Sequence, residues 1–398
     1  MENPYRTLAI NSYSTTLKYT TTQSEEIRQN ISNQLQIIND ERAHLLLPAM
    51  ILIGCMMLFA IVGNSLVIYI FSRKFKATTQ TTLFLALACF DLMTSSIAMP
   101  FEIFDLRYFF TFESSILCKF MRSWVAFPIM ASNQVLLLIA IDRYLKVCRP
   151  LKKQIIPHLA RKLIFLSVAL SIVFTVPAFL IYGTRSAWTH VPGLLGSDCS
   201  TSDAMKDSLF PIIYEVLLLV VFVSFVIILG ILYGLIWRVS QRKAFRSQVF
   251  RERGRLLSHT SSSDHGHQPP KTFKFQVSTC EDTHPGDLTT ALSFSTGNLR
   301  NGRRTSKSTI IAFTVTSVFF LSFLPHLGLA LMKNIKKDFD YHLEDAELVA
   351  FNIFLRSFFV NPVAHPVVYA TMNVKFRHEC VCLIKRLTKC CLCKRQSS

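Results

Sequence analysis

The chain has 398 residues, of which 51% are hydrophobic, and its mean hydropathy is +0.35. Only 17% of the residues are charged, compared with about 25% in a typical soluble domain. This composition argues against an ordinary cytosolic enzyme and against a disordered chain.

Seven apolar runs are long enough to cross a bilayer, whose core of about 30 Å needs roughly 20 helical residues. Any single run is compatible with a helix buried in a soluble core, but seven in one chain favour membrane helices. We therefore predict an all-α fold, a bundle of seven transmembrane helices. The predicted spans are Leu45–Phe71, Thr81–Phe101, Ser123–Ile141, Leu163–Thr184, Ser208–Trp237, Ser308–Met332 and Ala346–Val374.

Charge placement predicts the orientation of the chain. Residues 1–40 lack the apolar segment of a signal peptide, so the first span is expected to direct insertion, with the N-terminus outside. The cytoplasmic segments then hold 30 lysines and arginines against 7 acids, and the outer segments hold 10 against 14. The net charge of +18 therefore indicates a cytoplasmic surface that faces anionic lipid and an acidic partner, rather than nucleic acid.

This orientation divides the chain into three parts. We expect an extracellular tail (1–44), a membrane domain (45–374) and a cytoplasmic tail (375–398). The membrane domain includes a long, disordered and phosphorylatable cytoplasmic loop at about 238–307. Asn30 begins the only clear glycosylation sequon, and it lies in the extracellular tail.

The cysteines separate by compartment. Cys118 and Cys199 are the only two in predicted outer segments, which favours a disulfide over two free thiols. In the basic tail, apolar residues recur at helical spacing, which predicts a short amphipathic eighth helix on the inner membrane face. Palmitoylation is the favoured use of the tail thiols, with metal binding or unmodified thiols as alternatives. The candidates are Cys380, Cys382, Cys390, Cys391 and Cys393.

Polar residues at similar depth in the spans predict a polar core. Asp91 lies near the middle of the second span, and ionisable groups in a bilayer usually face the bundle interior. A sodium ion or a water cluster would satisfy its carboxylate, and a protonated Asp91 is the alternative. No other cofactor or metal is expected. The core candidates are Asn64, Asp91, Ser132, Asn361 and His365.

Ordered motifs in the spans resemble those of the rhodopsin-like (class A) G-protein-coupled receptors. Asp142-Arg143-Tyr144 matches the DRY motif, and Cys118 lies 25 residues before Arg143. Tyr233–Ile236 also looks like the end of span five in cholecystokinin-type peptide receptors. The other matches are Gly63-Asn64, Leu85–Asp91, Phe222, Tyr233, Phe319 with Pro325, Asn361 with His365-Pro366 and Tyr369, and Phe376-Arg377. The resemblance implies a divergent multi-pass receptor of the plasma membrane.

The family's activation roles can be carried over to the matching positions. Arg143 is expected to pair with Asp142 at rest, and then to meet Tyr233, Tyr369 and a G-protein helix. Snorkelling of Arg143 to the interface is the alternative. Residues 303–307 contain no acid, so a weak resting latch and some ligand-free signalling are expected. The implied coupling residues are Asp142, Arg143, Tyr144, Tyr233, Phe323, Pro325, His365, Pro366 and Tyr369.

Three residues depart from the family pattern. Phe323 replaces the usual tryptophan of span six, His365 replaces an asparagine in span seven, and Phe225 replaces a proline in span five. Phe323 keeps an aromatic ring but has no donor, and His365 suggests a pH-sensitive basal state. A helix kink at Pro325 or Pro366 is either a hinge or passive.

A ligand cavity is expected at the outer ends of the spans. Val125 stands where amine receptors have an aspartate, so a small amine lacks its usual counter-ion. Charges of both signs suit a peptide better than a lipid, although Glu102, Asp105, Lys119 and Arg122 are equally consistent with solvated rim residues or mutual ion pairs. The ligand-binding candidates are Arg122, Val125, Glu215, His326 and Arg356.

The predicted function is therefore that of a non-enzymatic receptor. It would bind an extracellular ligand, most consistently a peptide, and activate a heterotrimeric G protein. Arrestin, receptor kinases and membrane lipids are further expected partners, and nucleic acid is not. A receptor-like scaffold or decoy without G-protein coupling is the main alternative, and a transporter or channel is a weaker one.

Overall fold

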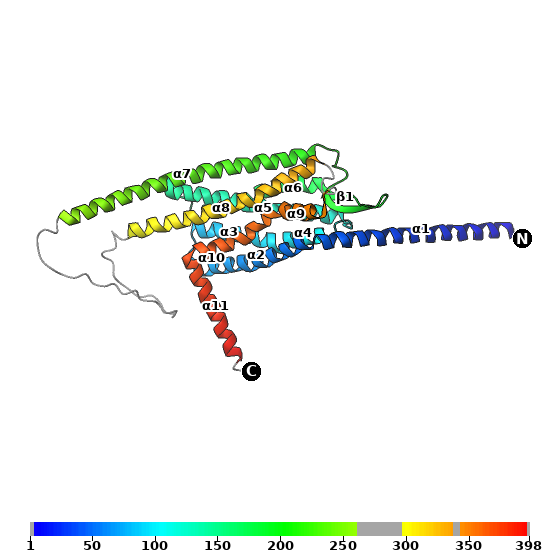
Figure 1. Cartoon of the computed structure of the whole chain (residues 1–398), viewed down its shortest axis with the longest axis horizontal. Coiled ribbons are helices and arrows are strands. Elements are labelled where there is room, and N and C mark those ends of the chain that lie inside the picture. Colours follow the sequence, from blue (N-terminus) through cyan, green and yellow to red (C-terminus); the bar gives the residue numbers. More distant parts are fainter. Residues whose placement is uncertain (1–3, 261–296, 337–342, 396–398) are drawn as a thin grey trace.

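Long apolar helices form most of the computed structural model, which describes residues 4–260, 297–336 and 343–395. Within these residues, six helices are long and apolar enough to cross a membrane, and a bent pair makes a seventh span. The spans pack into one bundle, with a two-stranded sheet at one end (Figure 1). They are α2 (Leu47–Lys74), α3 (Thr79–Met93) with η1 (Thr94–Ala98) and α4 (Met99–Arg107), α5 (Ser115–Cys148), α6 (Pro157–Ile181), α7 (Phe210–Thr260), α8 (Gly297–Ile335), and α9 (Asp345–Leu355) with η3 (Ser357–Phe359) and α10 (Val360–Met372).

Two of the spans are interrupted. The second contains the π-helical turn η1, directly before Pro100 in α4. The seventh bends by 47° between α9 and α10, at Arg356, whose backbone (φ −104°, ψ 15°) leaves the helical region. Pro325 and Pro366 lie inside α8 and α10, so the bend of the seventh span is not at either predicted hinge. Their mechanical role stays a prediction.

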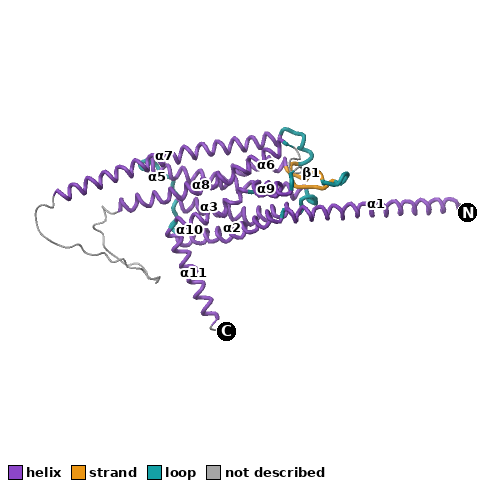
Figure 2. Tube along the Cα trace, viewed as in Figure 1, coloured by secondary structure: helices purple, strands orange, loops and turns teal. Residues whose placement is uncertain are grey.

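The sheet closes one end of the bundle, which we call the hairpin end; the opposite end is the Arg143 end. Strands β1 (Tyr182–Trp188) and β2 (Leu195–Thr201) are antiparallel. Because β1 begins directly after α6, the predicted fourth span, Leu163–Thr184, extends too far into this strand. Figure 2 shows the two strands at this end of the bundle. The predicted disulfide joins Cys118 at the start of α5 to Cys199 in β2, so the hairpin is fixed to the third span.

A close approach between α2 and α10 holds the first and seventh spans together. A Cβ atom added at Gly63 would lie only 2.8 Å from Pro366, so this position requires glycine. At the next residue, the Asn64 side-chain amide donates to the backbone oxygens of Ala60 and Pro362 at 2.9 and 2.8 Å. The matched Gly63-Asn64 motif is therefore a helix-packing feature of this bundle.

Helices continue into segments that the sequence did not mark as helical. The expected outer tail forms α1 (Pro4–Leu45), which projects from the hairpin end (Figure 1). The prediction of a disordered loop at about 238–307 is wrong at both flanks, because α7 continues to Thr260 and α8 begins at Gly297. Its remaining part, 261–296, lies outside the described residues.

The predicted eighth helix is present and longer than expected. Helix α11 (Val374–Arg395) runs at a steep angle to the bundle (Figure 1). Phe376 anchors its start, because its ring is buried against Phe71 and Tyr369, with centroids 5.6 and 6.4 Å apart.

Candidate functional site

A cavity of about 380 Å³ opens among the spans near the hairpin end, within the range of small-molecule and peptide side-chain sites. Its walls come from α4 to α9 and from the hairpin. All five ligand-binding candidates line it: Arg122, Val125, Glu215, His326 and Arg356.

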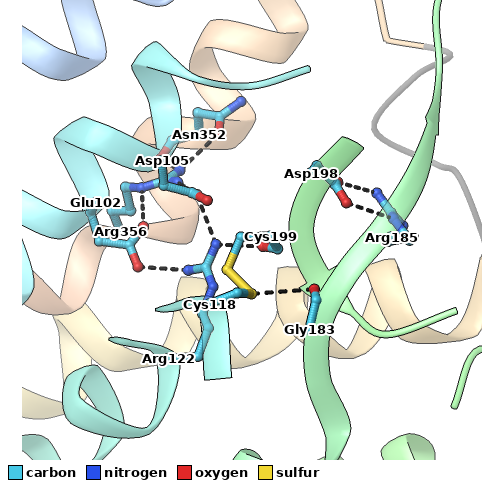
Figure 3. Close-up of polar contacts among 10 residues, drawn as sticks. All are labelled: Glu102, Asp105, Cys118, Arg122, Gly183, Arg185, Asp198, Cys199, Asn352 and Arg356. Carbon is cyan, nitrogen blue, oxygen red and sulfur yellow. Dashed lines mark hydrogen bonds and ion pairs between the residues drawn. A yellow bond between two sulfur atoms is a disulfide. The ribbon is translucent and has the colours of Figure 1, made fainter. Parts of the chain in front are cut away.

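Four charges, two of them buried (Glu102 and Arg356) and two partly buried (Asp105 and Arg122), lie in the wall of this cavity and its surroundings, and we call them the charge cluster (Figure 3). Arg122 donates to Glu102 and to Asp105, each at 2.7 Å. Arg356 donates to Glu102 at 2.7 Å and to Asp105 at 3.2 Å. Each arginine therefore touches both acids, which neutralises four charges in a place that water barely reaches.

The charge cluster joins segments that are far apart in the sequence. Its acids come from α4, Arg122 from α5, and Arg356 from the break in the seventh span. Arg122 also donates to the backbone oxygen of Cys199 at 2.9 Å, and Arg356 to the side-chain oxygen of Asn352 at 2.7 Å. The cluster thus ties three spans to the disulfide-linked strand, as Figure 3 shows.

A third buried acid, Glu215, lies on α7 in the wall of the cavity. The neutral hydroxyl of Tyr182 lies beside the carboxylate and interacts with it. Burial and the neighbouring Glu215 charge raise the pKa of Tyr182, so the phenol keeps its proton and donates. No lysine or arginine in the described part of the chain forms an ion pair with Glu215.

Aromatic rings form the floor of the cavity. Phe323 stacks on Phe319 and Phe222, with centroids 5.3 and 5.5 Å apart, and His326 meets Phe323 edge-on. His326 Nδ1 donates to the backbone oxygen of Leu355 at 2.6 Å. Phe323, which stands where the family pattern has a tryptophan, is thus part of an apolar layer between the cavity and the centre of the bundle.

A histidine meets the buried acid at the centre of the bundle. His365 Nδ1 lies 2.6 Å from a carboxylate oxygen of Asp91, and the pair borders a cavity of about 20 Å³ with Ser132 and Asn361, enough for roughly one water. Asn64 does not border this cavity, because its amide is used between α2 and α10. The Asn361 side-chain oxygen accepts from Ser322 at 3.0 Å.

This donor set fits a sodium ion poorly. A hard cation needs several oxygen ligands, whereas the ring nitrogen of His365 engages the Asp91 carboxylate and Asn361 is already bonded. The residues fit an internal Asp91–His365 pair better. The pH dependence expected from His365 stays a prediction.

At the Arg143 end, the guanidinium of Arg143 pairs with the carboxylate of Asp142, and both side chains are buried. Lys146 adds a second contact to Asp142 at 2.8 Å. Tyr233 instead bonds Thr316 at 3.1 Å, and Tyr369 packs on Phe84. The arrangement is the paired one expected for rest, while Tyr144 is half-buried nearby.

The comparisons with known proteins agree with this geometry. The family described as 7 transmembrane receptor (rhodopsin family) matches residues 63–369, which is most of the chain. The chain belongs to this family. The bent pair α9 and α10 is therefore its seventh span, and the predicted fold, a multi-pass membrane bundle, is confirmed.

Individual relatives agree with the family assignment. This receptor is similar to the human cholecystokinin receptor type A, with 24% identity over 356 residues, 82% of this chain and 78% of that receptor. It is also similar to the mouse protein named probable G-protein coupled receptor 19, with 32% identity over 138 residues, 34% of this chain. The chain spans about a third, 33%, of that protein's length.

Several residues of the receptor's sites were not predicted from the sequence. Tyr182 and Asn352 were missed, because neither belongs to a motif. Asn39 and Arg42 were missed as well: Asn39 accepts from the backbone nitrogen of Phe110 at 3.0 Å, and Arg42 contacts His190 in the hairpin connection. Their position beside the first span was the only available signal.

The predicted modification sites have mixed positions. Asn30 lies exposed on α1. Cys380 and Cys382 are half-buried on α11, and burial raises the pKa of the Cys380 thiol. The side chains of Cys390, Cys391 and Cys393 lie outside the described residues. Glycosylation and palmitoylation stay predictions.

Proposed function

We propose that this receptor is a G-protein-coupled peptide receptor of the plasma membrane, with the hairpin end outside the cell. The observation that carries the proposal is the shared helix α5. One end of α5 supplies Arg122 and Val125 to the cavity, and the other supplies Arg143 to the buried pair with Asp142. Movement of one rigid element therefore affects both sites.

The charge distribution supports this orientation. The segments at the Arg143 end hold 30 lysines and arginines against 7 acids, as expected for cytoplasmic loops and for a surface that meets anionic lipids and an acidic partner. Separation of the helices there frees Arg143 for Tyr233, Tyr369 and the carbonyls of a G-protein helix. Arrestin and receptor kinases use the same exposed surface after activation.

The likeness to a cholecystokinin receptor and the mixed charges of the cavity support a peptide ligand. A purely apolar ligand would leave the buried carboxylate of Glu215 without an opposite charge. Glycosylation at Asn30 and acylation of the α11 cysteines belong to the proposal, since they agree with the proposed orientation.

G-protein activation in cells tests the proposal, with wild type beside Arg143→Ala. We expect measurable ligand-free signalling from wild type and its loss in Arg143→Ala at equal surface expression. Arg149→Ala is the matched control, because Arg149 is an exposed arginine near the same end of α5. Equal basal signalling from wild type and Arg143→Ala would contradict coupling through Arg143.

A scaffold that does not couple is the second candidate. The direct pairing of Asp91 with His365 favours it, because this pair joins α3 to α10 and opposes rearrangement of the bundle centre. The variant His365→Asn distinguishes the coupling receptor from the scaffold. If wild type does not signal and His365→Asn does, the result supports the scaffold.

A further inference from the structure

The cavity contains two kinds of buried acid. Glu102 and Asp105 each contact two arginines of the charge cluster. Glu215 is also buried, with 7% of its surface exposed, but the polar group that interacts with it is the neutral phenol of Tyr182.

Among the described residues, no cation forms an ion pair with Glu215. Lys206 and Lys333 line the same cavity, yet in the described part of the chain neither forms an ion pair with this carboxylate. A single neutral donor satisfies only part of a carboxylate, which has about four acceptor sites. Glu215 therefore has acceptor capacity left over, in a wall that faces the cavity.

The two arginines of the charge cluster, by contrast, already have hydrogen-bond partners within the protein. Arg122 and Arg356 donate to Glu102, Asp105, Asn352 and the backbone of Cys199, while the Nε of Arg122 is buried and makes no hydrogen bond. A ligand carboxylate would have to break these bonds, whereas a ligand cation at Glu215 would break none. Apolar residues around Glu215, among them Phe222 and Leu218, lower the local polarity and strengthen a charge-assisted contact.

We propose that Glu215 binds a cationic group of the ligand, an ammonium or a guanidinium, and so selects peptides with a basic residue or a free N-terminus. This inference rests on the proposed function, because it names the chemistry of the ligand for the same cavity. Tyr182 orients the carboxylate, and the aromatic floor accepts the apolar groups that flank the cation.

Affinity selection with the full-length purified receptor tests the inference without a signalling step. The probe is a synthetic N-acetylated hexapeptide-amide library in which every arginine-containing member has a citrulline twin, equal in shape but uncharged at that side chain. Mass spectrometry of the retained peptides gives the arginine-to-citrulline ratio. We expect wild type to retain the arginine twins about tenfold or more over the citrulline twins, since losing one partner of a buried charge pair costs at least this much.

Variants assign the preference to the carboxylate. Glu215→Gln should reduce the ratio to near one, and Glu215→Asp, which keeps the charge, should retain a preference. Glu113→Gln is the matched control, because Glu113 is exposed in the neighbouring loop, and it should behave as wild type. An equal ratio for wild type and Glu215→Gln, or no arginine preference in wild type, overturns the inference.

The two proposals fail separately. Arginine selection without any G-protein response would reject the proposed coupling and keep the cationic ligand. A G-protein response with no arginine preference would reject the cationic ligand and keep the proposed coupling.

Discussion

Glu102 and Glu215 are the same residue type, buried to a similar degree in the lining of one cavity, but they have different partners. Glu102 is held by two arginines within a four-charge cluster, with only 3% of its surface exposed. Glu215 has one neutral partner. Burial of a charge therefore does not by itself distinguish a structural group from a recognition group, and the set of partners does.

The contrast has an energetic meaning. A paired cluster stabilises the arrangement of α4, α5 and α9, because removing one member leaves the remaining three with an unbalanced buried charge. A carboxylate without a cation costs the folded state desolvation energy, which a ligand can return on binding. Substitutions in the charge cluster should therefore lower stability, whereas substitutions at Glu215 should change ligand selection.

Arg356→Met should have the largest effect on stability. It leaves Glu102 and Asp105 to share Arg122 alone, and breaking a buried ion pair costs about 3–5 kcal/mol. The thermal unfolding midpoint of the solubilised receptor measures the loss. Arg107→Met is the matched control, since its pair with Asp40 is about half exposed and exposed pairs contribute about 0–1 kcal/mol. Equal midpoints for the two variants would show that the cluster is not a structural unit.

The double variant Glu102→Gln with Arg356→Met should be less damaging than the sum of its single changes. It removes one acid and one base and leaves Asp105 with Arg122, 2.7 Å apart. Residues in one ionic network couple by about 0.5–3 kcal/mol. A double-mutant cycle on thermal unfolding measures this coupling, and strictly additive losses would contradict the cluster.

Tyr182→Phe should cost about 1 kcal/mol, the typical net value of one hydrogen bond. The effect is smaller than in the cluster because no opposite charge is orphaned. Thermal unfolding measures it, and the same variant should weaken the arginine preference while Tyr108→Phe, at the end of α4, leaves it unchanged. A loss as large as that of Arg356→Met would mean that Tyr182 supports the fold rather than Glu215.

The sequence predicted the positions of the membrane spans better than the contacts between their side chains. Apolar length alone located all seven spans, although the third was predicted as Ser123–Ile141 and is observed as Ser115–Cys148; lipid imposes a minimum length on any spanning helix. The depth of Glu215 and Arg356 in their spans correctly placed both in the cavity wall. Hydropathy does not fix the rotation of a helix, however, so the sequence left ion pairs and rim positions equally open for Glu102, Asp105 and Arg122.

For the same reason, side-chain contacts between spans that are distant in the sequence could not be predicted. The sequence placed His365 and Asp91 at comparable depth, but which side chain meets the carboxylate depends on helix packing. The bend at Arg356 also had no signal, because it lies at an arginine while the prolines of the region lie elsewhere. The hairpin and α1 were missed since a short polar strand and a polar helix lack an apolar pattern.

Glu215→Gln should have the smallest effect on stability and the sharpest effect on ligand choice. Glutamine keeps the shape and accepts from Tyr182, and no cation loses its partner, so the free energy of unfolding should change by less than about 1 kcal/mol, with stabilisation the expected sign. Glu102→Gln, which orphans two arginine contacts, should be clearly less stable in the same thermal unfolding assay. If Glu215→Gln proved the less stable of the two, the carboxylate would have to be paired within the protein, and the distinction between the two acids would be lost.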